Sequence, residues 1–81
     1  MERRAVGLAM RKLRSSRGMS QEDLALVSGM HRTYVGSIER GERNPSLVVL
    51  TRVATALGVR PWELLRLADE LHEAATGSAQ G

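Results

Sequence analysis

The sequence predicts an all-α fold in which five short helices form one compact bundle. Aliphatic residues recur at helical spacing in five segments, whereas aromatic residues are limited to one Tyr and one Trp among 81 residues. Glycine or proline marks the gaps between these segments, and the gaps are short, as in a helical bundle. No repeat or linker divides the chain. We therefore expect a single domain over residues 1–74 and a flexible tail over residues 75–81.

The first helix is predicted over residues 3–16 and the second from Ser20 to Ser28. Gly18 ends the first helix, and Ser20 with Asp23 three residues later has the spacing of a capping box, which begins the second. Gly29 ends the second helix by adopting the left-handed conformation. The residues expected to be buried are Val6, Ala9, Met10 and Leu13 in the first helix and Leu24, Ala25 and Val27 in the second.

The third helix is predicted from about His31 to Arg40 and is closed by Gly41. Val35 and Ile38 face inward in this prediction. The outer side is expected to carry Arg32, Thr33, Gly36 and Ser37. Two short helices joined by a glycine turn, as over residues 20–41, form a helix-turn-helix, which presents one helix to the major groove of DNA.

The fourth helix is predicted to begin after a cap at Ser46 and to end at Gly58. The fifth is predicted to begin at Pro61 and to end at about Glu73. The expected apolar stripe of the fourth helix is Leu47, Leu50, Ala54 and Leu57. The fifth helix has more apolar residues than one face requires, namely Leu64, Leu65, Leu67, Ala68 and Leu71. Because a domain of this size is only marginally stable by itself, the surplus predicts a partner.

Composition excludes several classes of site. The chain has no cysteine, which excludes disulfides and zinc fingers, and its two histidines are far apart, so we expect no metal and no cofactor. No apolar run approaches the roughly 20 residues that cross a bilayer, and residues 1–10 lack a signal-peptide core, so we expect a cytoplasmic protein without a membrane partner. Residues 1–45 hold nine Lys and Arg against five Asp and Glu, whereas residues 46–81 hold three against four. The basic half suits a polyanionic partner.

The outer side of the third helix has the chemistry of a base-reading surface. Arg32 can donate two hydrogen bonds to guanine, the methyl group of Thr33 can meet a thymine methyl, and Ser37 and Tyr34 add hydroxyls. Phosphate contacts are expected from Gln21 in the first turn of the second helix and from the loop residues Arg43 and Asn44. Arg17 and Arg40 are interpreted as general surface charge.

The segment Leu13 to Val59 carries a resemblance to a known family. Its motifs LR…R, G-x-SQE-x-LA, the turn glycine, IERGER, NPSL and A-x-ALGV occur in order. The segment resembles the Cro/CI-type (Xre) helix-turn-helix regulators, whose bundle is of the lambda-repressor type. RTYVGSIERGERN is similar to the controller proteins of restriction–modification systems, which are short five-helix dimers.

The resemblance assigns roles to the residues that match the family's motifs. It implies base reading by Arg32, Thr33 and Ser37, with Tyr34 near the backbone or a base step. Phosphate contacts are implied for Gln21, Arg43 and Asn44. It also implies a structural ion pair between Arg14 and Glu39, so Glu39 is not taken for a catalytic acid.

The first hypothesis is a homodimeric regulator that occupies an inverted repeat in double-stranded DNA and blocks or contacts RNA polymerase. Its expected dimer interface is Trp62, Leu65, Leu67 and Leu71 in the fifth helix, extended by Val48 and Val49 on the outward side of the fourth. In the alternative for this helix, Trp62 and Leu65 belong wholly to the core. The second hypothesis is an antitoxin or adaptor whose third helix binds protein. An enzyme is not expected, because Asp23, Glu39, Glu42 and the histidines form no acid/base or metal pattern.

Overall fold

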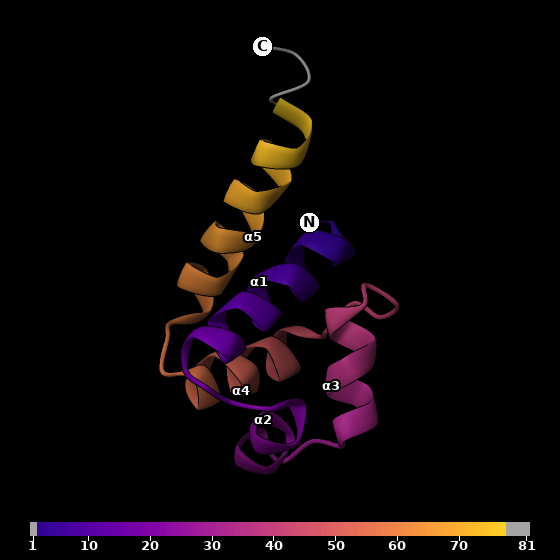
Figure 1. Cartoon of the computed structure of the whole chain (residues 1–81), viewed down its shortest axis with the longest axis vertical. Coiled ribbons are helices and arrows are strands. Elements are labelled where there is room, and N and C mark those ends of the chain that lie inside the picture. The colour runs from indigo at the N-terminus through magenta and orange to yellow at the C-terminus, as the bar shows by residue number, and fades with distance from the viewer. Residues whose placement is uncertain (1, 78–81) are drawn as a thin grey trace.

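The computed structural model describes residues 2–77 as helices packed around one core (Figure 1). They are α1 (Arg3–Ser16), α2 (Gln21–Ser28), α3 (Arg32–Glu39), α4 (Leu47–Leu57) and α5 (Pro61–Gly77). α5 lies along α1, while α2 and α3 pack against each other at the other end of the molecule. α4 contacts α2, α5 and α1. No strand occurs within residues 2–77, and the predicted five-helix, all-α fold is confirmed.

Most helix ends fall where the sequence predicts them, because capping residues determine them. The Ser20 hydroxyl accepts the Asp23 backbone N–H at 3.0 Å, and the Asp23 carboxylate accepts the Ser20 backbone N–H at 2.8 Å. Ser46 caps α4 through its hydroxyl. Gly29 and Gly58 end α2 and α4 with φ values of 72° and 74°, a region that glycine enters without steric cost. These four positions set the limits of α2 and α4.

The ends of α3 and α5 differ from the prediction. α3 begins at Arg32, with His31 as an N-cap that makes no side-chain hydrogen bond. α5 continues to Gly77, so the prediction of a tail was wrong for residues 75–77, and residues 78–81 of that tail lie outside the described residues. The extra turn is favoured by alanine, and it lies against the start of α1, where Leu71 and Ala75 line one groove with Leu8.

The core is almost entirely aliphatic and draws on all five helices. Its members pack with few charged neighbours, so the fold depends on shape and apolar area. The largest fully buried side chains are Met10, Leu24, Val35, Ile38, Val53, Leu57 and Leu64.

Three apolar residues lie on a different side of their helix from the one predicted. Val27 is 62% exposed, because the inward face of α2 is centred on Leu24, Ala25 and Ser28. The inward face of α4 includes Val53. In this orientation of the helix, Val49 faces the core and Leu47 faces solvent. Leu47 is therefore 74% exposed, and Val49, which was expected to face outward, packs against the core.

The crossing of α1 and α3 is unusually close at Gly7. A Cβ atom at this position would overlap the backbone carbonyl oxygens of Ile38 and Glu39. Since these atoms belong to the backbone, they cannot move aside as a flexible side chain could. Glycine is therefore required here, and α3 lies directly against the backbone of α1.

Candidate nucleic-acid interface

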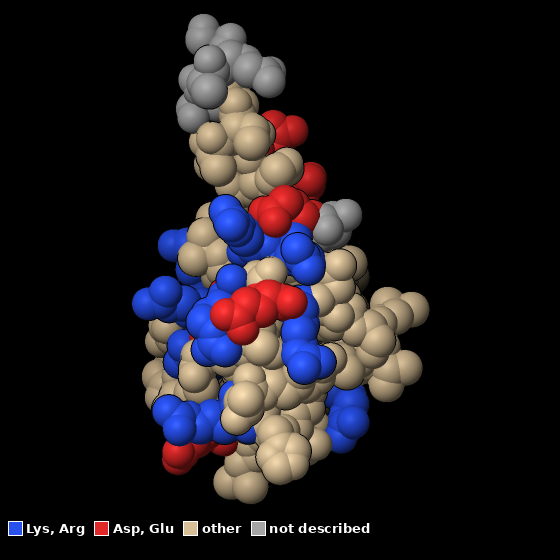
Figure 2. Space-filling view, turned by 90° about the vertical axis from the view of Figure 1, so that its right-hand side faces the viewer, with Lys and Arg blue, Asp and Glu red and all other residues tan. Residues whose placement is uncertain are grey.

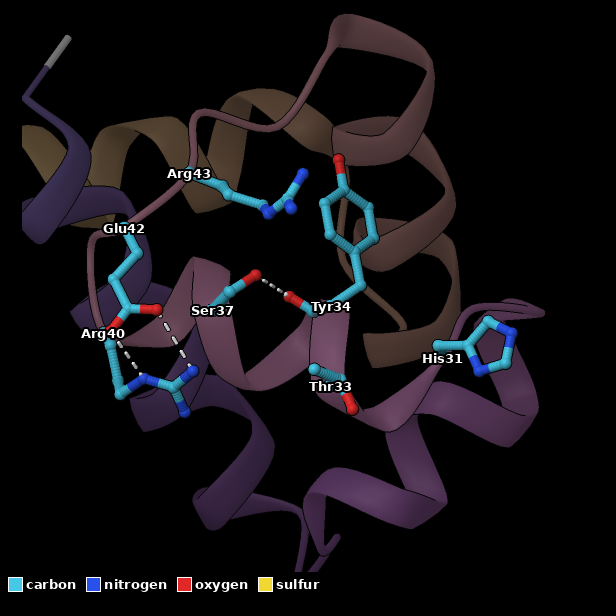
Figure 3. Close-up of a pocket in the computed structure, with 7 residues that line it drawn as sticks. All are labelled: His31, Thr33, Tyr34, Ser37, Arg40, Glu42 and Arg43. Atoms are coloured by element: carbon cyan, nitrogen blue, oxygen red, sulfur yellow. Dashed lines mark hydrogen bonds and ion pairs between the residues drawn. The ribbon is translucent and has the colours of Figure 1, made fainter.

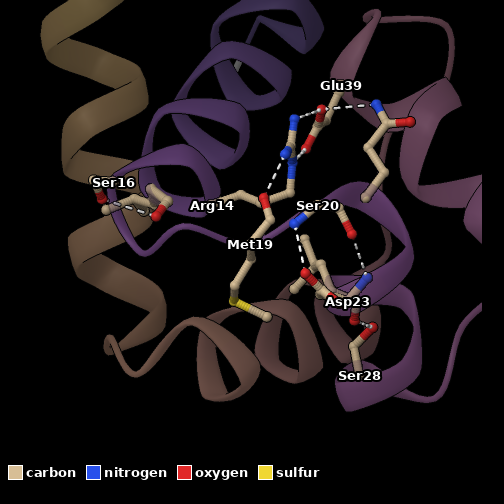
Figure 4. A network of polar contacts seen from close by, with 10 residues as sticks. Arg14, Ser16, Met19, Ser20, Asp23, Ser28 and Glu39 are labelled. Atoms are coloured by element: carbon tan, nitrogen blue, oxygen red, sulfur yellow. Dashed lines mark hydrogen bonds and ion pairs between the residues drawn. The ribbon is translucent and has the colours of Figure 1, made fainter.

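A buried polar network holds the end of α3 against α1 and α2 (Figure 4). The Arg14 guanidinium donates to both carboxylate oxygens of Glu39, at 2.7 and 3.0 Å, and to the Met19 carbonyl at 2.7 Å. The Gln21 amide nitrogen also donates to Glu39, at 3.0 Å. The Arg14 and Glu39 side chains are only 12% and 3% exposed. The hydrogen bond to Glu39 raises the pKa of Arg14, as expected for a charge-assisted pair.

The network makes α3 a rigid platform. It joins the last turn of α1, the turn before α2, the first turn of α2 and the last residue of α3. Hydrogen bonds are directional, and both partners of the ion pair are desolvated, so alternative positions of α3 lose several bonds together. The Arg14–Glu39 pair implied by the resemblance is thus present. The Glu39 carboxylate accepts hydrogen bonds from Arg14 and Gln21.

The N-terminal half of α3 presents polar side chains to solvent. Arg32 and Thr33 are exposed, and Tyr34 is half-buried. The guanidinium carbon of Arg43 lies 5.6 Å from the centre of the Tyr34 ring, within cation–π distance. The loop after α3 is thereby coupled to the helix itself. The guanidinium of Arg32, the hydroxyl and methyl groups of Thr33 and the phenol of Tyr34 are therefore presented together by the start of α3.

A hollow of about 470 Å³ separates Tyr34 from the end of α3 (Figure 3). In Figure 3, Tyr34 and Arg43 stand on one side of it, and Arg40 and Glu42 on the other. The residues that line it are His31, Thr33, Tyr34, Ser37, Arg40, Glu42 and Arg43. Because Arg40 and Arg43 outnumber the single carboxylate of Glu42, the lining has a net positive charge and suits an anionic group.

Two residues predicted for the outer side of α3 are buried. Ser37 is 7% exposed, because its hydroxyl donates to the Tyr34 carbonyl at 2.8 Å and lies deep in the hollow. Gly36 is covered by the side chains of Arg40 and Gln21, whose terminal atoms lie 3.0 and 3.5 Å from where a Cβ would be. Both residues line hollows on the α3 surface, but neither exposes much area of its own.

Two of the expected phosphate-binding residues have particular surroundings. The amide nitrogen of Gln21 faces Glu39, and the side chain borders a second, smaller hollow beside Arg32 and Thr33. Asn44 is exposed but lines a hollow next to Pro45 at the start of α4, away from the hollow that Arg43 lines. Of the three, Arg43 is therefore the one placed beside the α3 side chains.

Arg40 and Glu42 form a pair that the sequence analysis did not foresee. Arg40 donates to the two carboxylate oxygens of Glu42 at 2.9 and 3.1 Å. These hydrogen bonds raise the pKa of Arg40 and lower that of Glu42. The signal in the sequence is the order Arg-Gly-Glu, since a left-handed glycine, here Gly41 with φ 76°, folds the two charges onto each other.

The side of the molecule that carries α3 is rich in basic side chains (Figure 2). Lysine and arginine gather there around a smaller acidic area. Arg32 also has an acidic neighbour, because its guanidinium lies 3.8 Å from the carboxylate of Glu22 in α2. Both groups are more than two-thirds exposed, so this pair is weak. The surface is therefore positive, with carboxylates beside two of its arginines.

The predicted interface residues of α5 divide into two groups. Trp62 is 58% exposed, whereas Leu65, Leu67 and Leu71 are partly buried against the core. Leu47 and Val48 at the start of α4 are 74% and 69% exposed. The alternative in which Trp62 belongs wholly to the core is therefore wrong.

Neither a metal site nor a membrane-spanning helix occurs within residues 2–77. No group of three or more His, Asp or Glu side chains among them is arranged to hold a metal ion. None of the described helices has the length and apolar character needed to span a bilayer.

Comparison with known proteins identifies the class. A helix-turn-helix family model matches residues 10–64. Control protein C.BamHI of Bacillus amyloliquefaciens is 48% identical over 60 residues, which cover 73% of this chain and 74% of that protein. The crystal structure of the restriction–modification controller protein C.AhdI from Aeromonas hydrophila matches with a TM-score of 0.74 and 51% identity, over 75% of this chain and 92% of that one.

A third comparison includes DNA. The controller protein C.Esp1396I, solved as a tetramer with its natural 35-base-pair operator, matches with a TM-score of 0.76 and 33% identity, over 83% of this chain and 88% of that one. The fold and the exposed face of α3, together with these matches, define a helix-turn-helix DNA-binding transcriptional regulator. The chain belongs to the Cro/CI-type (Xre) helix-turn-helix family, and the family predicted from the sequence is confirmed.

Proposed function

We propose that this protein binds an inverted repeat in double-stranded DNA as a homodimer and controls transcription by occupying promoter DNA. The observation that carries the proposal is the position of Arg32 and Thr33, exposed at the start of a helix that the Arg14–Glu39 network holds rigidly. Rigid placement favours sequence reading, because base edges accept hydrogen bonds only in defined geometry. Occupancy requires no catalysis.

Within the interface, Arg32 and Thr33 read base edges. Ser37 and Tyr34 have a smaller share in base reading, since Ser37 is buried and Tyr34 is half-buried. Arg43 binds the DNA backbone from its place over the Tyr34 ring. Gln21 and Asn44 add backbone contacts, Gln21 through the groups that its bond to Glu39 leaves available.

The second copy binds through α5 and the start of α4. Trp62 is the expected anchor, since large exposed aromatic residues dominate association energies. Leu65, Leu67 and Leu71 supply the neighbouring apolar surface, and the exposed Val48 extends it. A dimer of this kind sets two α3 helices about 34 Å apart, one turn of B-DNA. The tetramer that C.Esp1396I forms on its operator is consistent with such assembly.

The regulated system is a restriction–modification locus, with RNA polymerase as the further partner of the DNA-bound dimer. The identities to C.BamHI and C.AhdI, both near one half, favour this subtype. A gene for a methyltransferase and one for an endonuclease beside this gene would support it. A neighbouring toxin gene would favour an antitoxin instead, although the polar face of α3 does not suit a protein-binding helix.

Selection of bound sites from a pool of random duplexes tests the proposal. We expect enrichment of an inverted repeat whose half-sites are one helical turn apart. The control is the Arg32→Ala variant, which should enrich sites with one relaxed position in each half. Enrichment of unpaired half-sites would contradict the dimer, and no enrichment would contradict sequence-specific binding.

A further inference from the structure

Arg40 lies where the two hollows on the α3 surface meet. It lines the hollow of about 470 Å³ beside Tyr34 and Arg43, and also the hollow of about 200 Å³ beside Arg32. Within residues 2–77, Thr33 is the only other residue that lines both. An arginine at this position lies among the residues proposed to meet DNA, although the sequence suggested only general surface charge.

Only part of the Arg40 guanidinium donates hydrogen bonds within the protein. Its Nε and one terminal nitrogen donate to Glu42, and the other terminal nitrogen lies over Gly36, 3.0 Å from where a Cβ would stand. Both side chains of the pair are 56% exposed. A glycine at position 36 thus leaves room for one end of the guanidinium to lie against α3, while the Glu42 carboxylate holds it there.

A carboxylate and a phosphate compete for the same donors. Each presents two oxygens that match the fork of an arginine, and each forms charge-assisted bonds with it. Glu42 therefore has the chemistry of a DNA phosphate, and the pair has almost no net charge toward DNA. A glutamate is ionised at neutral pH, and the hydrogen bonds from Arg40 lower the pKa of Glu42 further, so the carboxylate keeps its charge.

We propose that Arg40 can bind a DNA phosphate, and that Glu42 limits the affinity for DNA by forming hydrogen bonds with the Arg40 guanidinium in place of that phosphate. The inference rests on the proposed function, in that it takes the α3 surface to face DNA. Phosphates are the same in every sequence, so Glu42 lowers affinity for cognate and random DNA by the same factor. A regulator that is weakened in this way dissociates more readily from both.

The test compares four proteins on a selected site and on a random 30-base-pair duplex, by fluorescence anisotropy from about 50 to 200 mM salt. The variants are Glu42→Gln, the double variant Arg40→Gln/Glu42→Gln, and Glu70→Gln. The last removes a carboxylate from another exposed pair, Arg66 and Glu70 at 3.3 Å in α5, and controls for the change in net charge. Thermal unfolding checks that all four are folded.

Glu42→Gln is expected to bind both duplexes more tightly, by about three- to tenfold at the lowest salt. Its salt slope should be steeper by about 1.8, the value for two added phosphate contacts, one from each protomer of the proposed dimer. The double variant and the wild type, in both of which the pair is neutral, are expected to agree within about twofold, and Glu70→Gln should match the wild type.

Three results would overturn the inference. They are an unchanged affinity of Glu42→Gln, equal affinities of Glu42→Gln and the double variant, and a gain confined to the selected site, which would indicate that residue 42 reads a base. Failure of the wild type to prefer any sequence would instead reject the proposed function, and the random duplex would still decide the role of Arg40.

Discussion

At the α2–α3 end, directional polar bonds hold the exposed residues in place, whereas along α5 aliphatic packing does so. Glu39 accepts three hydrogen bonds at one end, while Leu64 and Ala68 bury α5 against the core at the other. The polar end leaves charged donors in solvent, and the aliphatic side leaves Trp62 there. The difference matches two partners, since base edges require fixed donors and a second protein surface requires apolar area.

The largest expected effect on stability comes from removing the buried ion pair at the polar end. Glu39→Ala leaves Arg14 buried without its partner, and this should lower the free energy of unfolding by about 3–5 kcal/mol. Chemical denaturation measures the loss. Glu70→Ala breaks an exposed pair as a control and should cost less than about 1 kcal/mol. Similar losses in the two variants would mean that the buried network contributes little to rigidity.

The next effect concerns the apolar side. Trp62→Ser should weaken self-association by about 2 kcal/mol, roughly thirtyfold, with little change in monomer stability, because the side chain is mostly exposed. Sedimentation measures it. The control is Leu26→Ser, an 83% exposed apolar residue in α2, which should leave association unchanged. A deletion of α5 is a poorer test, since it would also remove Leu64 from the core.

A third prediction separates base reading from backbone binding within the polar end. Arg32→Ala should cost about 1–3 kcal/mol of discrimination at one base position in each half-site. Arg43→Ala should weaken all sequences alike and lower the salt slope by about 1.8, because each protomer of the proposed dimer loses one phosphate contact. Titration of cognate and mutated duplexes checks both. Equal losses on cognate and random DNA for both variants would contradict the assignment.

The smallest expected effect is a pH dependence of stability at the polar end. Hydrogen bonds from the backbone and side chain of Ser20 lower the pKa of Asp23. A depressed folded-state pKa gives stability that is present above the unfolded value of about 3.9 and is lost as the pH falls through the folded value. The stability difference between wild type and Asp23→Asn should therefore shrink below about pH 4 in denaturation experiments. Asp69→Asn in α5 is the control, and a difference that persists at pH 2 would contradict the prediction.

The sequence was sufficient for features that depend on local chemistry. The capping box at Ser20, the cap at Ser46 and the glycine ends of α2 and α4 follow from side-chain and backbone preferences within a few residues. The Arg14–Glu39 pair came from the family resemblance, since 25 residues separate its partners.

Features set by packing were missed. Nothing in the sequence near Gly7 indicates that α3 would lie against its backbone. The burial of Ser37 depends on its bond to the Tyr34 carbonyl, and the burial of Val49 depends on a rotation of α4. The prediction for α5 ended too early because its last turns are supported by α1, which a periodicity argument within α5 does not detect.

The Gly7 crossing has a consequence for the spacing of operator half-sites. α3 rests on the backbone of α1, and α1 packs along α5, so the proposed dimer joins its two reading helices through contacts that leave little freedom. One base pair inserted between the half-sites would rotate one of them by about 35° around the DNA axis. A dimer with flexible contacts between its helices would adapt to that rotation by bending, whereas this one would have to twist the DNA. In the proposed dimer, the close contact at Gly7 would therefore make the spacing of the half-sites a determinant of binding.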